Sequence, residues 1–389
     1  MIPADTVYLD YAATTPVDPR IVDALPGWLA ADGAFANPSS THAAGRRAAA
    51  LVSSAAEQVA SLLGCAPGQL VWTSGATESD NLAILGAARY RAGRGRHLVT
   101  LPTEHKAVTD AFRQLEREGF DVTWLAPSPD GRLSLESLRQ ALRDDTQLVS
   151  VMHVNNETGV IQDIPAIADL CRERGVLLHV DAAQSFGKLP IDLAVWPVDF
   201  LSITAHKVYG PKGIGALYVS GRPGSHVAPL FHGGGQQGGL RPGTLPAHLI
   251  AAFGLAAGIA AESMRQDRAH LARLRSRFQD AIRGIPGLRH NSPDDGFPGI
   301  INVSAGDVDG ESLMLALEPL CVASGSACNS ARTEPSGVLR ALGLDDAEAQ
   351  GAIRFSFGRP TTTSEVDFAA AHYRAAVERL RDIAPGAAA

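Results

Sequence analysis

Short apolar runs alternate with helical patterns through the middle of the chain. Runs rich in apolar and β-branched residues predict seven strands, at residues 70–73, 97–101, 122–125, 148–154, 176–180, 200–204 and 216–219. Between most of them, apolar residues at helical spacing predict helices at 78–90, 107–118, 135–143 and 164–174. Because the predicted strands are apolar on both faces, we expect an α/β fold with a mostly parallel central sheet covered by helices.

Helical patterns also border this region. Apolar residues spaced from Leu51 to Leu62 predict a helix that ends at Gly64, and a longer helix is predicted over residues 249–285. The elements beyond it are shorter and mixed, with strands at 300–303 and 352–357 and helices at 311–317 and 364–383. The pattern therefore predicts a smaller α+β domain after the large one.

Composition narrows the classes to which the protein can belong. Its 389 residues suffice for about two domains, and 45% hydrophobic with 19% charged residues exclude wholesale disorder. A net charge of −7 disfavours direct binding of nucleic acid, which needs basic surface. We expect no membrane segment, because the longest nearly apolar run, residues 249–261, is shorter than the ~20 residues of a spanning helix. Four cysteines without zinc spacing, and an N-terminus without a signal pattern, predict a reducing, cytoplasmic setting.

A candidate phosphate site lies at residues 74–79, Ser-Gly-Ala-Thr-Glu-Ser, between a predicted strand and a predicted helix. Backbone N–H groups at a helix N-terminus bind phosphate when small side chains allow close approach. A plain helix cap explains the same residues, and the segment matches neither the Walker A nor the dinucleotide pattern. A second phosphate-related feature is needed to decide between the two interpretations.

Asp181 stands at the carboxyl end of an apolar strand, where ligands of open α/β sheets bind. Its carboxylate could be a metal ligand, a general base, the partner of a pyridinium nitrogen, or only a cap. We expect His179 to face the other side of the sheet, which disfavours a metal site.

Lys207 directly follows the strand at 200–204 and precedes a glycine-rich turn. Partial burial would disfavour its ammonium form and make the amine available for Schiff-base chemistry. A phosphate site, a strand-end carboxylate and a strand-end lysine, in this order, are the parts that binding of pyridoxal 5'-phosphate requires.

Other polar residues follow the predicted strands at the same edge of the sheet. They include His105, which could stack on a flat ring and move protons, and Asn155, Asn156 and Gln184. A lone histidine is more often structural, so this placement alone does not assign a role.

Two further candidates come from the last third of the chain. Cys328 lies among small polar residues typical of an exposed loop, whereas Cys65, Cys171 and Cys321 have core-like surroundings. A free thiol has a pKa of about 8.5, so catalysis by Cys328 would need a positive neighbour. Arg354, within a short strand, could hold a substrate carboxylate or make only a surface ion pair.

Taken together, these motifs resemble those of the IscS/NifS-like cysteine desulfurases of the class V aminotransferase superfamily. The resemblance covers nearly the whole chain; it runs over residues 9–16, 74–81, 104–106, 153–159, 180–184, 206–215, 233–235, 324–330 and 353–358. It implies a fold type I architecture that depends on pyridoxal 5'-phosphate. The large domain would span residues 14–256, and a small domain, residues 257–389 with 1–13, would carry the Cys328 loop.

The resemblance also implies a role for each matching residue. Lys207 would hold the cofactor as a Schiff base, Asp181 would pair with the ring nitrogen, Gln184 would bond the phenolic oxygen, and His105 would stack on the ring. The phosphate would be bound by Ala76, Thr77, Thr204 and His206, with Thr244 from the second protomer of a homodimer. Asn156, also expected among the cofactor-binding residues, would hold the substrate carboxylate together with Arg354, and Cys328 would accept the sulfur.

The implied reaction turns L-cysteine into L-alanine and leaves a persulfide on Cys328. An acceptor protein would then take the sulfur for iron–sulfur cluster assembly or for thiolation of tRNA, DNA or cofactors. We expect no resident metal, although Cys328 could ligate a transient iron–sulfur cluster. The chain departs from the family in its short tail after Leu380 and in residues 236–239, Gln-Gln-Gly-Gly, where relatives commonly carry an arginine.

Several alternatives stay open at this stage. An aminotransferase or a selenocysteine lyase would bind the same cofactor and would not need Cys328. A non-catalytic sulfur-relay or assembly protein would have no use for Lys207, Asp181, His105 and Cys328 together. A thiol hydrolase that uses Cys328 and a histidine has no distinctive local signature here.

Overall fold

The computed structural model describes residues 6–324 and 335–383, so Cys328 and most of its loop lie outside the described residues. The helices are α1 (Pro19–Leu29), α2 (Ala43–Leu63), α3 (Ala76–Tyr90), α4 (Lys106–Arg117), α5 (Leu135–Ala141), α6 (Ile164–Glu173), α7 (Ala247–Ile282), α8 (Gly310–Ala316), α9 (Gly337–Ala341), α10 (Asp346–Gln350) and α11 (Thr363–Ile383). The strands are β1 (Val7–Tyr8), β2 (Leu70–Thr73), β3 (His97–Thr100), β4 (Asp121–Trp124), β5 (Thr146–Met152), β6 (Leu177–Asp181), β7 (Phe200–Thr204), β8 (Gly215–Val219), β9 (Leu288–His290), β10 (Ile300–Ala305), β11 (Leu320–Cys321), β12 (Ala323–Ser324) and β13 (Ala352–Ser356). Three 3₁₀ turns, η1 (Pro67–Gln69), η2 (Ala205–Lys207) and η3 (Gln236–Gly239), complete the set.

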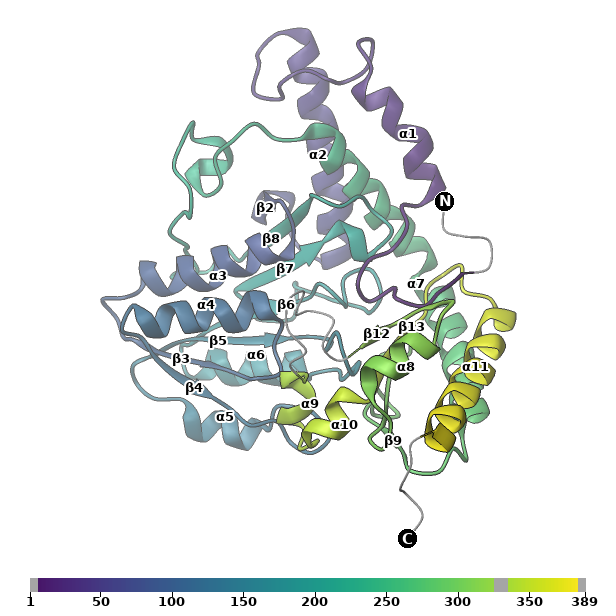
Figure 1. Ribbon diagram of the computed structural model, residues 1–389. Helices are drawn as coiled ribbons and strands as arrows, with labels where there is room; N and C mark the ends of the chain where they lie inside the picture. Colours follow the sequence, from purple (N-terminus) through teal and green to yellow (C-terminus); the bar gives the residue numbers. More distant parts are fainter. Residues whose placement is uncertain (1–5, 325–334, 384–389) are drawn as a thin grey trace.

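A seven-stranded sheet forms the centre of the larger part of the protein (Figure 1). Its strand order is β2-β8-β7-β6-β5-β3-β4, and every strand but β8 runs in the same direction. The predicted α/β fold with a mostly parallel sheet is therefore confirmed. Each of the seven predicted strands is present, with ends that differ by no more than two residues from the prediction.

Helices cover both faces of this sheet, and the side chains of the strands alternate between them. One hydrophobic cluster joins Leu98, Leu148 and Leu177 to α3 and α4. The other joins Val149 and Leu178 to α2, α6 and the first half of α7. Because both faces are buried, the strands carry few polar residues except at their ends, where the chain leaves the sheet.

A second, antiparallel sheet lies beside the first, in the order β12-β13-β10-β9 (Figure 1). Its core is a cluster that includes Phe278 of α7, Phe355 of β13 and Tyr373 of α11. The N-terminal strand β1 pairs in parallel with β11, so the start of the chain joins this part of the molecule. The predicted α+β character of the last third is confirmed by these elements.

Helix α7 belongs to both hydrophobic clusters, Phe253 lying in one and Phe278 in the other. By length and composition it is the one helix of the described chain that could cross a membrane, although the run at 249–261 predicted none. Of its most apolar window, 56% is buried inside the protein. Burial of this kind is found in core helices of proteins that cross no membrane.

Sequence patterns missed several short elements, for physical reasons. Strands β9, β11 and β12 have two or three residues each, too few to show a periodicity. Helix α1 contains an internal proline, Pro26, which usually interrupts a helix. Helices α9 and α10 have five residues each.

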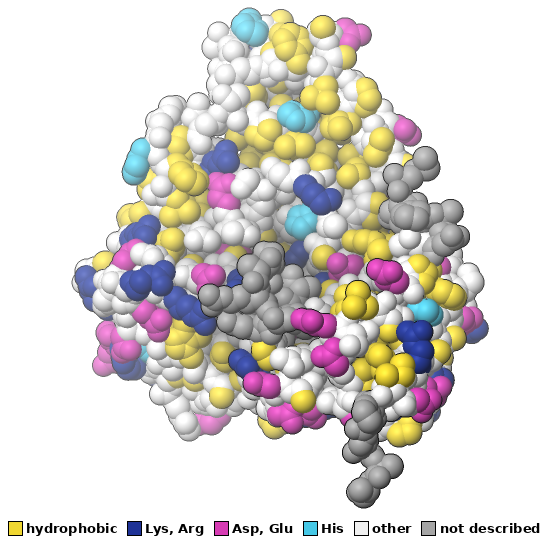
Figure 2. Space-filling view, in the orientation of Figure 1, with side chains coloured by type: hydrophobic (Ala, Val, Ile, Leu, Met, Phe, Trp, Pro, Cys, Tyr) yellow, Lys and Arg dark blue, Asp and Glu magenta, His cyan; other side chains and the backbone are white. Residues whose placement is uncertain are grey.

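The surface mixes charges of both signs. Figure 2 shows lysine and arginine side chains interspersed with aspartate and glutamate across the face seen in Figure 1. Many of them form exposed pairs, such as Arg143 with Asp121 and Arg289 with Glu348. No single-sign surface dominates this face, in keeping with the small net charge.

The contact between α2 and α7 gives a stability test with its own control. A Cβ atom on Gly254 would lie 2.5 Å from the Cα atom of Ala55, whereas on Gly258, one turn later, the nearest such atom is the side-chain nitrogen of Gln58 at 3.6 Å. Gly254→Ala should therefore lower the free energy of unfolding by about 1–3 kcal/mol. Gly258→Ala should raise it by about 0.5–1 kcal/mol, because alanine favours helix. Urea unfolding measures both, and equal effects would contradict this account of the packing.

Candidate active site

A cavity of about 600 Å³ opens at the carboxyl ends of the parallel strands. Its walls come from separate segments of the chain, which the fold brings to one place. They are residues 10–14, residues 74–78, the turn after β3, the turn after β5, the strand ends at 181–183 and 204–213, and β13; the lining residues are Asp10, Ala12, Ala13, Thr14, Ser74, Gly75, Ala76, Thr77, Glu78, His105, Asn156, Asp181, Ala183, Thr204, His206, Lys207, Lys212, Gly213 and Arg354.

The N-terminus of α3 forms one end of the cavity. Gly75 is the N-cap residue and has no side chain that could cap the helix, so the first-turn N–H groups of Ala76 and Thr77 are not capped from there. Thr204, the last residue of β7, and His206 line the same cavity. These four residues, predicted as phosphate ligands, are thus brought together, and the helix dipole adds positive potential.

His206 is held at this end by its imidazole Nδ1, which lies 3.2 Å from the hydroxyl of Thr14. Burial, followed by the charge of Lys207, lowers the pKa of His206 to about 4. The imidazole is therefore neutral near pH 7. Thr14 and Lys212 also line the cavity, although the sequence analysis assigned them no role. The closeness of Lys212 to Lys207 in the same glycine-rich segment could have indicated Lys212.

Asp181, His105 and Lys207 line the same cavity and interact electrostatically. The Asp181 carboxylate is buried at the end of β6 and accepts a hydrogen bond from the Ala183 N–H at 2.8 Å. His105 is the N-cap of α4, and its Nδ1 accepts from the Ala107 N–H at 3.1 Å. That bond leaves the proton of the neutral ring on Nε2. Burial, then Lys207, lowers the pKa of His105, while burial, then Asp80, raises the pKa of Asp181.

Asp80, Glu104 and His179 lie in the protein interior beside Asp181, and sequence reasoning missed the two carboxyl groups. Both are buried, and burial raises the pKa of Asp80 to about 7 and that of Glu104 well above its ordinary value. The Nε2 atom of His179 lies 3.5 Å from the Asp80 carboxylate and 2.9 Å from the Ser202 hydroxyl. Asp80 stands between Ser79 and Asn81 near the start of α3, so its sequence neighbours gave no sign of its burial.

The expectation that His179 faces away from Asp181 was wrong. The His179 imidazole lies 3.5 Å from the Asp80 carboxylate, and Asp181 interacts electrostatically with the same carboxylate. Since Asp80 is on α3, His179 and Asp181 both lie on the face of the sheet that α3 covers. The reason is the two-residue period of a strand, in which positions i and i+2 share a face. Even so, among the residues that the structure describes, no three His, Cys, Asp or Glu side chains are arranged to hold a metal ion.

Arg354 and Asn156 also line the cavity and contact each other. The Arg354 guanidinium donates from Nη1 to the Asn156 carbonyl at 2.8 Å and from Nη2 to the Asp10 carboxylate at 2.7 Å. Its Nε–H group and the side-chain oxygen of Asn156 are buried without a hydrogen-bond partner among the described residues. Since Arg354 is buried, the simple surface ion pair is ruled out, and an anion is the natural partner for the remaining donor.

Two predicted site residues among the described ones, Gln184 and Thr244, do not line the cavity. Gln184 is buried next to it, where its amide donates to the Ala12 carbonyl and accepts from Lys188. Thr244 is exposed, and its role toward a second protomer stays a prediction. Cys328 lies outside the described residues. Asn155, another strand-end candidate, makes turn hydrogen bonds to Glu157 and Thr158 instead.

The segment at 236–239, which departs from the family pattern, is bound to the edge of the large sheet. The side-chain amide of Gln237 accepts from the Trp72 N–H at 2.6 Å and donates to the Trp72 carbonyl at 2.9 Å. The following Arg241 pairs with Glu78 of α3 at 2.8 Å. This loop therefore supports the N-terminus of α3.

The donor set fits pyridoxal 5'-phosphate. The uncapped helix N-terminus matches a phosphate, the buried Asp181 carboxylate matches a protonated ring nitrogen, and Lys207 supplies an amine in the same cavity. The unpartnered Arg354 Nε–H and Asn156 oxygen leave room for an amino-acid carboxylate and amine. Five strand ends, residues 10–14 and the distant strand β13 thus bring together groups that match the cofactor and an amino acid.

Comparison with known proteins gives one consistent result. Residues 7–368 match the family described as aminotransferase class-V. The chain is 53% identical over 381 residues, 97% of its length and 94% of the relative's, to a protein of Photobacterium profundum named cysteine desulfurase IscS. Among solved structures it is similar to a NifS-like protein (TM-score 0.89, 34% identity, 96% of this chain and 100% of that one). It is also similar to SspA in complex with cysteine (TM-score 0.81, 40% identity, 92% and 100%).

The buried His179 predicts a pH dependence of stability. Burial lowers its pKa from 6.5 to about 4, so between these values the unfolded chain binds more protons than the folded one. The free energy of unfolding should therefore fall as the pH falls through this range, by about 2 kcal/mol between pH 7.5 and pH 5 from His179 alone.

The measurement is urea unfolding of wild type and His179→Gln at several pH values. The variant should be less stable at pH 7.5, and the difference should shrink toward pH 5. Gln in place of the exposed His232 serves as the control and should leave the slope unchanged. Parallel pH profiles for wild type and His179→Gln would refute the assignment.

Proposed function

The chain belongs to the aminotransferase class-V family, and from that premise we propose that it is a cysteine desulfurase, which takes sulfur from L-cysteine and releases L-alanine. The cofactor is pyridoxal 5'-phosphate. The sulfur stays on Cys328 as a persulfide and passes to an acceptor protein for iron–sulfur cluster assembly or thiolation of tRNA, DNA or cofactors. The high identity over nearly the whole length of IscS proteins supports this activity.

One structural observation carries the proposal. An amine (Lys207), a carboxylate (Asp181), an imidazole (His105) and a guanidinium (Arg354) line one cavity that begins at an uncapped helix N-terminus. A docking platform without catalysis gains nothing from four buried or half-buried ionisable groups, because their burial costs folding free energy.

The cofactor would be held at both ends by this chain. The first-turn N–H groups of Ala76 and Thr77, with the side chains of Thr204 and His206, bind the phosphate, and Thr244 of a second protomer completes the set. Asp181 pairs with the ring nitrogen. Gln184 gives one amide N–H to the Ala12 carbonyl, so its second N–H would donate to the phenolic oxygen. Bound in this way, pyridoxal 5'-phosphate supplies an electron-withdrawing ring that stabilises negative charge on the substrate carbon.

The residues around the ring orient the substrate and move its protons. Arg354 and Asn156 hold the carboxylate of L-cysteine, which fixes the Cα–H bond relative to Lys207. The amine of Lys207 takes the Cα proton. His105, whose Nδ1 is occupied by the Ala107 N–H, stacks on the ring and holds its proton at Nε2, from which it assists proton transfer.

Cys328 then takes the sulfur. Its thiolate attacks the substrate sulfur, so that a sulfur–sulfur bond forms and the carbon–sulfur bond breaks. The electron pair of the broken bond remains with carbon, which accepts a proton to give L-alanine. Atoms and electrons balance without an external oxidant, and the product on the protein is a persulfide.

We extend the proposal to the organisation of the protein. Residues 14–256 form the cofactor-binding domain, and residues 257–389 with 1–13 form a smaller domain; two separate hydrophobic clusters support this division. Native-state amide hydrogen exchange tests this division. If the amides of both clusters open with the same free energy, the division is contradicted. The free thiols of Cys65, Cys171 and Cys321 support a reducing, cytoplasmic location, which cell fractionation tests.

Two variants separate sulfur transfer from cofactor binding. Cys328→Ala should abolish alanine and persulfide formation from L-cysteine, by at least about a thousandfold, while the visible absorbance of the bound cofactor stays unchanged. Lys207→Ala should lose both the absorbance and the borohydride-stable attachment of the cofactor, because the amine that holds it is gone. Absorbance spectroscopy, mass spectrometry and an alanine assay measure these effects.

The outcomes discriminate between the remaining functions. Undiminished turnover in Cys328→Ala would favour an aminotransferase or a selenocysteine lyase. Wild-type protein that binds no cofactor would favour a non-catalytic assembly protein.

A homodimer is the expected assembly, since Thr244 is exposed and large apolar side chains such as Phe35 and Phe231 are solvent-accessible. Sedimentation should give a mass of about 81 kDa, twice the 40.7 kDa of one chain. Phe231→Glu should weaken the dimer at least about tenfold. The matched control is Leu315→Glu, at a more exposed apolar side chain of α8, and should not change the mass. A fully active monomer would count against the dimer.

A further inference from the structure

Thr15 bridges the backbone on both sides of Lys207. Its hydroxyl donates to the His206 carbonyl at 2.9 Å and accepts from the Tyr209 N–H at 2.8 Å, while its own N–H donates to the same His206 carbonyl at 2.8 Å. Thr15 is 3% exposed and does not line the active-site cavity. One buried side chain, distant in sequence, therefore spans the two residues Lys207 and Val208.

The backbone that Thr15 holds is in an unfavourable conformation. Tyr209 has a φ of 64°, a left-handed value that an aromatic residue rarely adopts. Such a conformation persists only where the surroundings determine it, and it often marks a functional site. Here the Tyr209 carbonyl also accepts from the Asp18 N–H at 2.9 Å, so both backbone groups of Tyr209 are bonded to the N-terminal segment.

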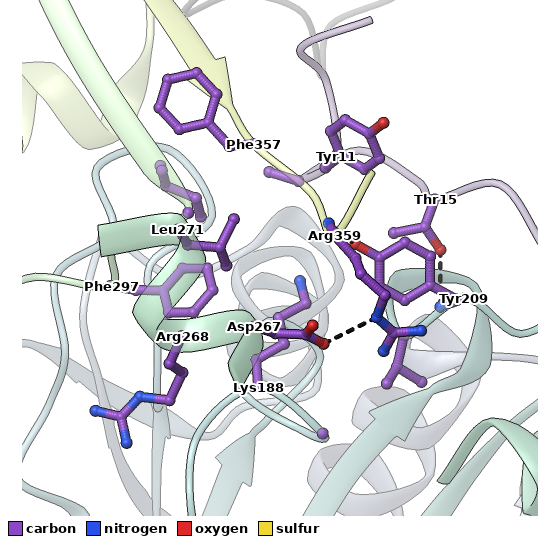
Figure 3. Close-up of a pocket in the computed structure, with 15 residues that line it drawn as sticks. Tyr11, Thr15, Lys188, Tyr209, Asp267, Arg268, Leu271, Phe297, Phe357 and Arg359 are labelled. Atoms are coloured by element: carbon purple, nitrogen blue, oxygen red, sulfur yellow. Dashed lines mark hydrogen bonds and ion pairs between the residues drawn. The ribbon is translucent and has the colours of Figure 1, made fainter. Parts of the chain in front are cut away.

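Arg359 holds the side chain of Tyr209 from the other part of the protein (Figure 3). Its backbone N–H donates to the Tyr209 hydroxyl at 2.6 Å, and its guanidinium lies 4.4 Å from the centre of the ring. The guanidinium also donates to Asp18 at 3.1 Å and to Asp267 of α7 at 2.9 Å. Arg359 follows β13, the strand that carries Arg354, so this contact connects the substrate end of the site to the lysine turn.

We propose that Thr15, Tyr209 and Arg359 form a clamp that positions Lys207, with Thr15 as its main positioning residue. None of the three needs to touch the reacting atoms. They keep the turn at 206–209 in one conformation, so that the amine of Lys207 points into the cavity. This inference rests on the proposed function, because it assumes that Lys207 holds the cofactor.

The three clamp residues also line one small cavity (Figure 3). It measures about 30 Å³ and is lined by Tyr11, Thr15, Tyr209 and Arg359 together with apolar side chains of the second sheet and α7. This space suffices for about one water-sized probe. Within this arrangement the Tyr209 side chain is fixed by its hydrogen bond from the Arg359 N–H and by the Arg359 guanidinium over its ring.

The test is Thr15→Val, which keeps the shape of the side chain and removes only the hydroxyl. Loss of two buried hydrogen bonds to the turn should raise the dissociation constant for pyridoxal 5'-phosphate about tenfold and lower kcat about tenfold. The KM for L-cysteine should change by less than about twofold, because Thr15 does not contact the substrate site. Tyr209→Phe, which removes only the acceptor for the Arg359 N–H, should act in the same direction and serves if Thr15→Val does not fold.

The matched control is Thr146→Val at the opposite ends of the strands. Thr146 is 6% exposed, and its hydroxyl also makes two bonds of 2.7 Å, to His97 and to the Arg143 N–H. It should lower the melting temperature as Thr15→Val does, but leave the cofactor affinity and kcat unchanged. If both variants lower only the melting temperature, Thr15 is a structural residue and the clamp is refuted.

A readout on the apoprotein separates failure of the clamp from failure of the proposed function. Pulse labelling with acetic anhydride and peptide mass spectrometry give the reactivity of Lys207 relative to Lys212, which lines the same cavity. This ratio should change several-fold in Thr15→Val and stay constant in Thr146→Val, whether or not the wild type is a desulfurase. An unchanged ratio in Thr15→Val overturns the proposal.

Discussion

Parallel pairing of β5, β6 and β7 is the constraint on which the active site depends. Met152 pairs with Asp181, and Asp181 with Ser202, so β5 and β6 end at the same level and β7 ends two residues beyond it. The residues that leave the sheet there, such as Asn156 and Lys207, consequently face one cavity. A shift of one residue in this register would turn Asp181 to the other face, toward α2 and α6. The hydrophobic alternation of β6, with Leu178 on that other face, prevents the shift.

The same edge concentrates buried ionisable groups whose charges must balance. Asp80, Glu104 and Asp181 are carboxyl groups with raised pKa values, while the pKa of His105 is lowered by burial and by Lys207. Placing these groups in the interior costs folding free energy, which marks the edge as a functional site and not as a packing device. A protonated ring nitrogen next to Asp181 would offset part of this cost, since it adds a positive charge where negative charge is otherwise poorly solvated.

The second sheet and the N-terminal segment complete the site from outside the large sheet. Arg354 of β13 contacts the carbonyl of Asn156 and the carboxylate of Asp10, while Thr15 and Arg359 hold the turn that contains Lys207. The substrate end and the amine are thus fixed by residues that follow each other closely in these two segments. Any displacement of the second sheet relative to the first would disturb both ends of the cavity together.

The sequence alone determined the local elements and the kinds of chemistry. Two-residue and helical periodicities located all seven strands of the large sheet, and Asp181, Lys207, His105 and the 74–79 segment were found because they follow apolar strands. Periodicity could not reveal Asp80 or Glu104, since a buried carboxyl group looks like a solvated one until its neighbours are known. The prediction for His179 was wrong because it placed residues 179 and 181, two positions apart in one strand, on opposite faces of the sheet.

Tertiary structure alone decided which distant residues meet. Asp10, Thr14 and Thr15 reach the site because β1 pairs with β11, a contact of two residues between segments more than 300 positions apart. Such a long-range pairing leaves no periodic pattern in the sequence. The packed core as a whole stabilises it, and the two short strands contribute little by themselves.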